Sequence, residues 1–404
     1  MNILFVSISS IPNVCIHSIS LDLLHEFKRN GHRICILCAL EKTNPKSTYY
    51  AQENGFEIVR VRIGGNKKAN VIEKGITTVR EPHKYIAAIK SFYNNVRFDL
   101  VLYPTPPITQ VQVVEYIKKR DGANSYLLLK DIFPQNAADI GMLSKTGVKG
   151  VLYKYFRRKE KRVYKVSDRI GCMSQANVDY VIKHNPEVDP KTVEFCPNCL
   201  KVIDKSVDDD TREQIREKYG IPQDKKVFVY GGNLGKPQGV PFIIECLQRC
   251  ANLNDAFFLV VGNGTEYRLL KDYEKSSGQK NFKLMSRLSR DDYDSMVGAC
   301  DVGLIFLDHR FTIPNFPSRL LSYMQAKVPV LAVTDPNTDI GKVITEGEFG
   351  WWCESNNSAV FRGLVESVLH SDTDDMKEKE FSYLLEHYAA EKAYNTILTS
   401  VMDR

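Results

Sequence analysis

A glycine-rich stretch at residues 230–239 has the composition of an anion-binding loop. It reads Tyr-Gly-Gly-Asn-Leu-Gly-Lys-Pro-Gln-Gly and lies between an expected strand and an expected helix. Glycines let backbone N–H groups approach an anion closely, and Lys236 adds a positive charge beside the start of the helix. The spacing matches neither a Walker A loop nor GxGxxG, which disfavours a dinucleotide enzyme. A tight glycine turn without a ligand is the alternative for this stretch alone.

Two further turns belong with this loop. Residues 259–266, Leu-Val-Val-Gly-Asn-Gly-Thr-Glu, place two glycines at the carboxyl end of a strand, where a ligand can approach closely. Residues 315–324, Asn-Phe-Pro-Ser-Arg-Leu-Leu-Ser-Tyr-Met, begin a helix, and the first N–H groups of a helix have no partner inside it. Together the three turns predict a binding site for a negatively charged ligand.

A carboxylate in the first half of the chain is the candidate to act on a hydroxyl group. Asp131 lies in the sequence Lys-Asp-Ile-Phe-Pro at residues 130–134, directly after an apolar strand. At the end of a parallel strand its side chain points toward a ligand, and it can accept the proton of a hydroxyl. Aspartate is also a common N-cap of a following helix, which is the alternative for Asp131.

The elements that must position these residues alternate between strand and helix. In the first half the apolar runs predict strands at 3–8, 33–39, 57–63, 100–103 and 125–129, and helices at 18–30, 110–120 and 150–166. The pattern then restarts, with strands at 227–230, 257–261, 283–285, 302–306 and 328–333, and helices at 240–250, 291–300 and 318–325. This alternation predicts an α/β fold of two Rossmann-like domains that face each other across a cleft.

The length of 404 residues fits two domains. We expect an N-terminal domain at 1–198 and a C-terminal domain at 203–380, joined after Cys196-Pro197-Asn198. A helix at about 382–404 carries an apolar stripe at helical spacing, so we expect it to return to the first domain.

The composition excludes several classes of protein. The hydrophobic fraction of 43% and the charged fraction of 26% are those of a globular chain. The first apolar run lacks a basic leader, and no run reaches the ~20 residues of a spanning helix, so we expect a cytoplasmic protein. Cys35/Cys38 and Cys196/Cys199 have CxxC spacing, but neither pair has a second pair or a CxxH close by, so we interpret the ten cysteines as reduced side chains.

A basic stretch between Lys149 and Arg169 combines lysines and arginines with apolar residues at helical spacing. One interpretation is a helix at an anionic membrane surface, on the inner face of the plasma membrane. Its aromatic residues suit the headgroup boundary; they are Tyr153, Tyr155, Phe156 and Tyr164. The alternative is a solvated face whose rings pack on the sheet. The stretch lacks an RNA-binding signature, so we expect no nucleic acid partner.

In order and spacing, these motifs resemble the donor half of family 4 glycosyltransferases, which carry a G-R loop ending in K-G, then V-G-x-G and E-G-F-P-x-x-x-L-E-A. Gly31-His32 and Pro197-Asn198 match two further family motifs, so the resemblance spans nearly the whole chain. Enzymes of O-antigen and capsule assembly are more similar still, with G-N-x-G-x-x-Q-G, P-S-K, and an R-D-x-W-P motif that residues 130–134 resemble.

The resemblance implies the two-domain GT-B fold and a hexosyl- or N-acetylhexosaminyltransferase. It implies a nucleotide-sugar donor, with UDP favoured, a polyprenyl-diphosphate-linked glycan as acceptor, and retention at the anomeric carbon. The residues that it places at the donor are Gly232, Asn233, Gln238, Gly262, Asn263, Gly264, Arg287, Leu288, Phe316, Pro317, Ser318 and Ser322. Those near the acceptor are Ser9, His17 and Lys130, and the candidate catalytic residues are Asp131, Lys236 and Arg319.

The chain departs from the family pattern at charged positions. Asn233 and Gln238 stand where the family has an arginine and a lysine, and its two glutamates fall on Pro314 and Ser322. No DxD motif lies at a strand end, so we expect neither a metal ion nor a cofactor. Lys236, Arg319 and helix N–H groups must then stabilise the leaving diphosphate.

Two other functions stay open at this point. A UDP-sugar 2-epimerase uses the same fold, although its chemistry asks for more carboxylates and histidines than these loops carry. A glycan-binding or partner subunit without catalytic activity is the second alternative, because the family glutamates are missing.

Overall fold

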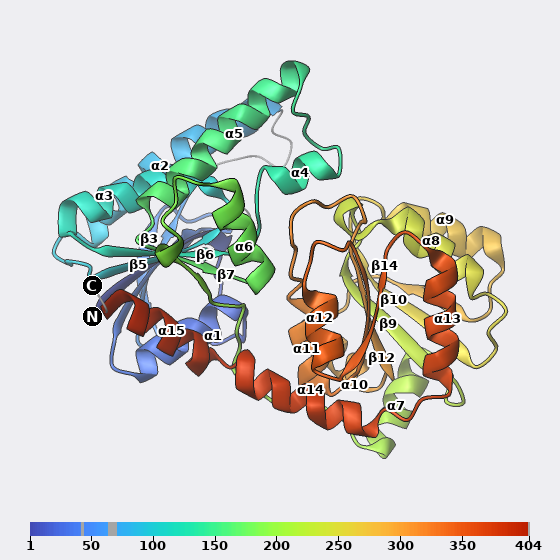
Figure 1. The fold of residues 1–404 in the computed structure, drawn as a ribbon. Helices are drawn as coiled ribbons and strands as arrows, with labels where there is room; N and C mark the ends of the chain where they lie inside the picture. The colour runs from blue at the N-terminus through green and yellow to red at the C-terminus, as the bar shows by residue number, and fades with distance from the viewer. Residues whose placement is uncertain (42–43, 64–70, 403–404) are drawn as a thin grey trace. The chain divides into compact units, whose positions relative to one another are not determined.

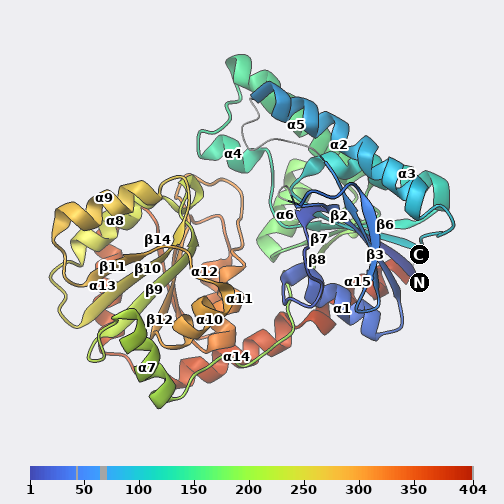
Figure 2. The ribbon, with the colours of Figure 1, turned by 180° about the vertical axis from the view of Figure 1, so that it is seen from behind.

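The computed structural model describes residues 1–41, 44–63 and 71–402, and the chain divides into two compact units. Unit 1 comprises Met1–Lys201 and Ala390–Arg404, and unit 2 comprises Val202–Ala389. Each unit is a largely parallel sheet covered by helices on both faces (Figures 1 and 2). The predicted α/β class with two parallel-sheet domains is confirmed.

The sheet of unit 1 has the strand order β3-β4-β2-β1-β5-β6-β7-β8. Its strands are β1 (Asn2–Ser10), β2 (Arg33–Ala39), β3 (Tyr49–Glu53), β4 (Phe56–Val61), β5 (Leu100–Thr105), β6 (Asn124–Leu129), β7 (Arg169–Cys172) and β8 (Val193–Phe195). All neighbouring pairs are parallel except β3 and β4, which form a hairpin. The hairpin turns at Asn54-Gly55, where both residues have positive φ, as a two-residue hairpin turn requires.

Helices cover both faces of this sheet. They are α1 (Ile19–Arg29), α2 (Val71–Phe92), α3 (Val111–Asp121), α4 (Gln135–Asp139), α5 (Gly147–Val166), α6 (Gln175–His184) and α15 (Ala390–Met402), with short turns η1 (Ile108–Gln110) and η2 (Pro190–Thr192). Helices α1 and α15 pack side by side on one face, over alternate strand residues such as Phe5 and Ile36. Helices α2, α3 and α5 lie on the other face (Figure 1).

Unit 2 contains a wholly parallel sheet in the order β11-β10-β9-β12-β13-β14. Its strands are β9 (Lys226–Asn233), β10 (Ala256–Asn263), β11 (Phe282–Met285), β12 (Val302–Phe306), β13 (Val330–Thr334) and β14 (Gly350–Glu354). The helices are α7 (Asp209–Tyr219), α8 (Val240–Arg249), α9 (Tyr267–Ser277), α10 (Arg290–Gly298), α11 (Arg319–Ala326), α12 (Ile340–Glu346), α13 (Ser358–Leu369) and α14 (Asp374–His387), with the short turn η3 (Lys236–Gln238). Helices α8, α9 and α13 cover one face, and α10, α11 and α12 the other (Figure 1).

Local signals in the sequence set where several helices begin and end. Ser18 caps α1 by accepting a hydrogen bond from the Leu21 backbone, and basic residues occupy its last turn. Asp208 caps α7 in the same way, and Gly220 ends that helix in the left-handed conformation. Each of these caps involves residues only a few positions apart, so it does not depend on contacts with distant parts of the chain.

The C-terminal segment differs from the prediction of one helix at about 382–404. The structure breaks it at Tyr388 and Ala389 into α14, which packs on α11 of unit 2, and α15, which packs on α1 of unit 1. The Tyr394 ring of α15 lies edge-on to Phe27, with ring centroids 4.8 Å apart. The first half of the apolar stripe packs in unit 2 and the second half packs in unit 1. Unit 1 therefore includes the chain from Ala390 onward.

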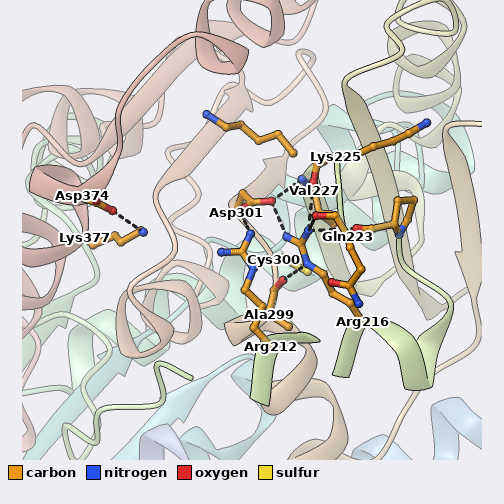
Figure 3. A network of polar contacts seen from close by, with 12 residues as sticks. Arg212, Arg216, Gln223, Lys225, Val227, Ala299, Cys300, Asp301, Asp374 and Lys377 are labelled. Atoms are coloured by element: carbon orange, nitrogen blue, oxygen red, sulfur yellow. Dashed lines mark hydrogen bonds and ion pairs between the residues drawn. The ribbon is translucent and has the colours of Figure 1, made fainter. Parts of the chain in front are cut away.

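A buried ion pair joins α7 to the sheet of unit 2 (Figure 3). The Arg216 side chain is 1% exposed, and its guanidinium lies 2.7 Å from Asp301 Oδ2 and 2.8 Å from the Ala299 carbonyl. The same Asp301 oxygen accepts a hydrogen bond from the Val227 backbone at 2.7 Å. Asp301 therefore connects α7, β9 and the segment before β12.

We expect Asp301→Ala to destabilise unit 2 by about 3 kcal/mol, because it leaves the Arg216 charge buried without a carboxylate. The two tryptophans, Trp351 and Trp352, both lie in β14, so tryptophan fluorescence in a urea titration reports the unfolding of this unit. The control is Asp374→Ala, which removes the exposed pair with Lys377 and should leave the midpoint unchanged. Equal midpoints for both variants would contradict the role given to Asp301.

Candidate functional site

Two glycines at the carboxyl ends of β9 and β10 bring backbone to the wall of a cavity in unit 2. Gly232 and Gly262 lie opposite each other in the parallel register, as do Asn233 and Asn263. A Cβ on Gly262 would lie 2.1 Å from the carbonyl oxygen of Gly232. Gly232 has φ +131°, and a Cβ there would lie 2.2 Å from Arg319 Nη2. Only glycine fits at both positions, which leaves open backbone for a ligand.

The loop after β9 is fastened by a side-chain amide. Gln238 Oε1 accepts hydrogen bonds from Asn233 Nδ2 at 2.9 Å and from the Gly235 backbone at 3.2 Å. The residues that replace the family arginine and lysine are therefore bonded to each other. They stabilise the shape of the loop and carry no charge.

Arg319, at the first position of α11, is a cation without a carboxylate. Its guanidinium lies 4.2 Å from the centroid of the Tyr230 ring, and Gly232 leaves the space that it occupies. Among the described residues no ion pair includes Arg319. A stacked ring is a weak partner for a desolvated charge, so this arrangement favours binding of an anion.

These groups surround a cavity of about 630 Å³ within unit 2. The residues that line it are Gly231, Gly232, Asn233, Gln238, Val261, Gly262, Asn263, Arg287, Leu288, Ser289, Arg290, Tyr293, Phe306, Leu307, Pro317, Ser318, Arg319 and Ser322. All candidate donor-binding residues line it except Gly264 and Phe316. The cavity is large enough for a nucleotide-sized ligand.

Gly264 and Phe316 have other surroundings. A Cβ on Gly264 would lie 2.2 Å from the Leu234 carbonyl oxygen, so this glycine lets the two loops pack on each other. The Phe316 ring lies 6.2 Å from that of Tyr388, at the end of α14. Neither residue lines the cavity; each packs against a neighbouring segment of unit 2.

Lys236, expected with Arg319 to stabilise the diphosphate, does not line the cavity that contains Arg319. It lines a second hollow of about 400 Å³, together with Asp308, Arg310 and Ser355, and does not line the larger cavity. The sequence neighbourhood of the glycines did not predict this: Lys236 begins the η3 turn and lines a hollow that Gly232 and Asn233 do not line.

Tyr293 of α10 is a lining residue that no sequence motif indicated. Its hydroxyl is buried, and no described residue accepts or donates a hydrogen bond to it. A Cβ on Gly231 would lie 1.8 Å from this hydroxyl, so Gly231 makes room for the ring. Burial raises the pKa of Tyr293 to about 12, which keeps the phenol protonated and able to donate a hydrogen bond.

The candidate catalytic carboxylate lies in unit 1, after β6. Asp131 Oδ2 accepts a hydrogen bond from Asn136 Nδ2 at 2.6 Å, whereas no described residue forms a hydrogen bond with its buried Oδ1. Burial raises the pKa of Asp131 to about 6. The neighbouring Lys130 ammonium lies 3.4 Å from Ser20 Oγ, and burial lowers the pKa of Lys130 to about 8.

The remaining candidates of unit 1 are Ser9, near the end of β1, and His17, in the connection from β1 to α1. The Ser9 side chain is exposed, and its backbone donates a hydrogen bond to Ser7 Oγ. His17 Nδ1 lies 2.9 Å from Asp22 Oδ1 of α1. Since Lys130 reaches Ser20 in the first turn of α1, Lys130 and His17 gather at the same helix start.

The arrangement in unit 2 is suited to an anion held by backbone N–H groups and one arginine. No cluster of three metal-ligating side chains occurs among the described residues. The helices of the described part of the chain include none that is both long and apolar enough to span a membrane.

Comparison with known proteins places this geometry in a family. The model of the glycosyl transferases group 1 matches residues 211–384, which lie within unit 2 and contain all of its cavity-lining residues. The chain is 24% identical over 326 residues to a probable glycosyltransferase, WbjE, of Pseudomonas aeruginosa, covering 80% of this chain and 79% of that protein. It is 21% identical over 246 residues to the putative colanic acid biosynthesis glycosyl transferase WcaI of Escherichia coli K12, covering 61% and 60%.

The fold is also similar to that of a solved structure. Anabaena Alr3699/HepE in complex with UDP and glucose matches with a TM-score of 0.70 and 13% identity, over 100% of both chains. The group 1 match, the sequence relatives and the two α/β units agree. The chain is therefore a glycosyltransferase with the GT-B fold, and its residues 211–384 match the glycosyl transferases group 1 family.

Proposed function

We propose that the cavity of unit 2 binds a nucleoside-diphosphate sugar, with UDP favoured. The observation that carries this is Arg319, a desolvated cation without a carboxylate partner at a surface of open glycine backbone. The diphosphate lies between the Gly232 loop and the start of α11, where helix N–H groups add to the guanidinium charge. The base lies nearer Gly262 and Leu288.

The reaction transfers the sugar to a hydroxyl of a polyprenyl-diphosphate-linked glycan. WcaI, named for colanic acid biosynthesis, supports a role in bacterial polysaccharide synthesis, of which capsule and O-antigen are examples. The HepE complex with UDP and glucose supports the nucleotide. Arg319 and the α11 N–H groups stabilise the leaving diphosphate without a metal ion, and the product retains its anomeric configuration. In unit 1, Lys130 and Asp131 meet the acceptor.

We expect Arg319→Gln to weaken UDP binding about 10- to 100-fold, because a charged hydrogen-bond donor to the diphosphate is lost. Isothermal titration with UDP measures the change, and sugar transfer should fall with it. The matched variant is Lys236→Ala, whose side chain faces the second hollow, and it should bind UDP with an affinity within a few-fold of the wild type. Loss of binding in Lys236→Ala, with Arg319→Gln unchanged, would reverse the assignment of the phosphate site.

The exposed face of α5 supports a further part of the proposal, that unit 1 associates with an anionic membrane surface from the cytoplasmic side. Val151, Leu152 and Tyr155 are 70%, 44% and 44% exposed. Lys154 and Arg158 are exposed beside them. Apolar side chains flanked by cations suit the headgroup region of anionic lipid, where a lipid-linked acceptor is found.

Several residues expected at this surface are used inside unit 1 instead. Tyr164 is buried, the Tyr153 hydroxyl donates a hydrogen bond to α4, and the Phe156 ring contacts Phe133. Arg157 lies 2.6 Å from the buried carboxylate of Glu160. A test of membrane binding must therefore leave Arg157 in place.

We expect Lys154→Glu with Arg158→Glu to reduce sedimentation with liposomes that contain anionic lipid, since each basic residue contributes about 1 kcal/mol near such a surface. Binding of the wild type should weaken as salt is added. The control is Lys271→Glu with Lys275→Glu, which makes the same charge change at the same spacing on α9 of unit 2. Equal sedimentation with neutral and anionic liposomes would refute membrane association through α5.

A further inference from the structure

Tyr230 lies in β9 directly before Gly231 and Gly232, and it does not line the cavity that these glycines border. Its side chain is buried, and its hydroxyl donates a hydrogen bond to the backbone carbonyl of Asn233 at 2.7 Å. A phenol that is attached to a strand at its base and bonded at its tip keeps one orientation of its ring. The strand end that forms the glycine wall of the cavity therefore also fixes this ring.

The Arg319 guanidinium lies over the face of the Tyr230 ring, with its central carbon 4.2 Å from the ring centroid. A guanidinium is planar, and its N–H groups all point outward in that plane. Contact through the face uses none of these donors, whereas a carboxylate partner occupies them, as Asp301 does for Arg216. The contact with the ring therefore leaves the N–H edge of Arg319 available for two oxygens of a phosphate group.

The same contact restricts the long side chain of Arg319. Arginine has several rotatable bonds, and rotamer freedom that is lost on binding weakens a complex. The Tyr230 ring lies on the face of the guanidinium, and Arg319 Nη2 occupies the space that a Cβ on Gly232 would fill. Since both contacts hold the guanidinium at the cavity wall before a ligand binds, part of that loss is already made in the folded chain.

We propose that Tyr230 is a positioning residue of the donor site, whose ring holds the Arg319 guanidinium with its N–H edge toward the diphosphate. This inference rests on the proposed function. Tyr230 acts through Arg319 and does not touch the ligand, so its contribution to binding exists only while Arg319 is present. The contribution also requires the diphosphate, and a nucleoside without phosphate gains nothing from it.

We expect Tyr230→Leu to weaken UDP binding about 10-fold in isothermal titration, because the ring contact of a desolvated cation is lost. Tyr230→Phe keeps the ring and should bind UDP within about three-fold of the wild type. In an Arg319→Gln background, Tyr230→Leu should change the UDP affinity less than about two-fold, since residues that act through one contact are not additive. Uridine, measured by its competition with UDP, should bind Tyr230→Leu with the wild-type affinity.

The matched control is Phe228→Leu, which removes a ring from the same strand and the same core. The Phe228 ring stacks on Phe258, with ring centroids 5.2 Å apart, so this variant should leave UDP affinity unchanged. Tryptophan fluorescence of β14 in urea shows whether each variant is folded. If Tyr230→Leu is unfolded, Tyr230→Met takes its place, because a flexible methionine fills an irregular gap in a core.

Two results would overturn the proposal while leaving the proposed function intact. One is an equal loss of UDP affinity in Tyr230→Leu and Phe228→Leu, which is the effect of a disturbed core. The other is the same factor for Tyr230→Leu with and without Arg319, including no change in either background. If the wild type binds GDP or dTDP in place of UDP, the variants are measured with that nucleotide. If it binds none of the three, the proposed function fails and this inference fails with it.

Discussion

The carboxyl ends of β9 and β10 approach each other so closely that a side chain fits at neither Gly232 nor Gly262. The cavity of unit 2, which we propose binds the donor, depends on this contact, because the missing side chains let backbone line the cavity and leave room for the Arg319 guanidinium. The parallel register sets the two glycines opposite each other, and the amide of Gln238 stabilises the loop that follows. A Cβ at either position would separate the strand ends or displace the cation.

Two arginines of unit 2 show how similar residues take different roles. Arg216 is surrounded by carbonyl oxygens and Asp301, so its charge is compensated in the folded chain and the residue stabilises the unit. Arg319 lies over an aromatic ring, and no carboxylate of the described residues pairs with it. Since desolvation of an unpaired charge costs free energy, a bound anion is the partner that Arg319 lacks. Among the described residues neither type of partner pairs with Lys236, and it lines a different hollow.

The two units contribute different chemistry. Unit 2 offers backbone N–H groups and a guanidinium, which suit a diphosphate. Unit 1 offers a buried lysine, a buried aspartate and an oriented histidine, which suit a hydroxyl group and its proton. This division agrees with a reaction in which one substrate leaves as an anion and the other loses a proton.

The sequence by itself determined the α/β class and pointed to most of the residues that line the cavity of unit 2, since apolar periodicity and glycine turns act within a few residues of chain. The Asn54-Gly55 hairpin also had a local signal, although it was not predicted. Only the tertiary structure decided that Arg319 and not Lys236 lines the cavity, that Tyr293 reaches Gly231, and that His17 pairs with Asp22. It also decided where the C-terminal stripe divides between the units. Each of these depends on the direction of a side chain relative to an element distant in sequence or on the path of a loop, and hydrophobic spacing carries no information about either.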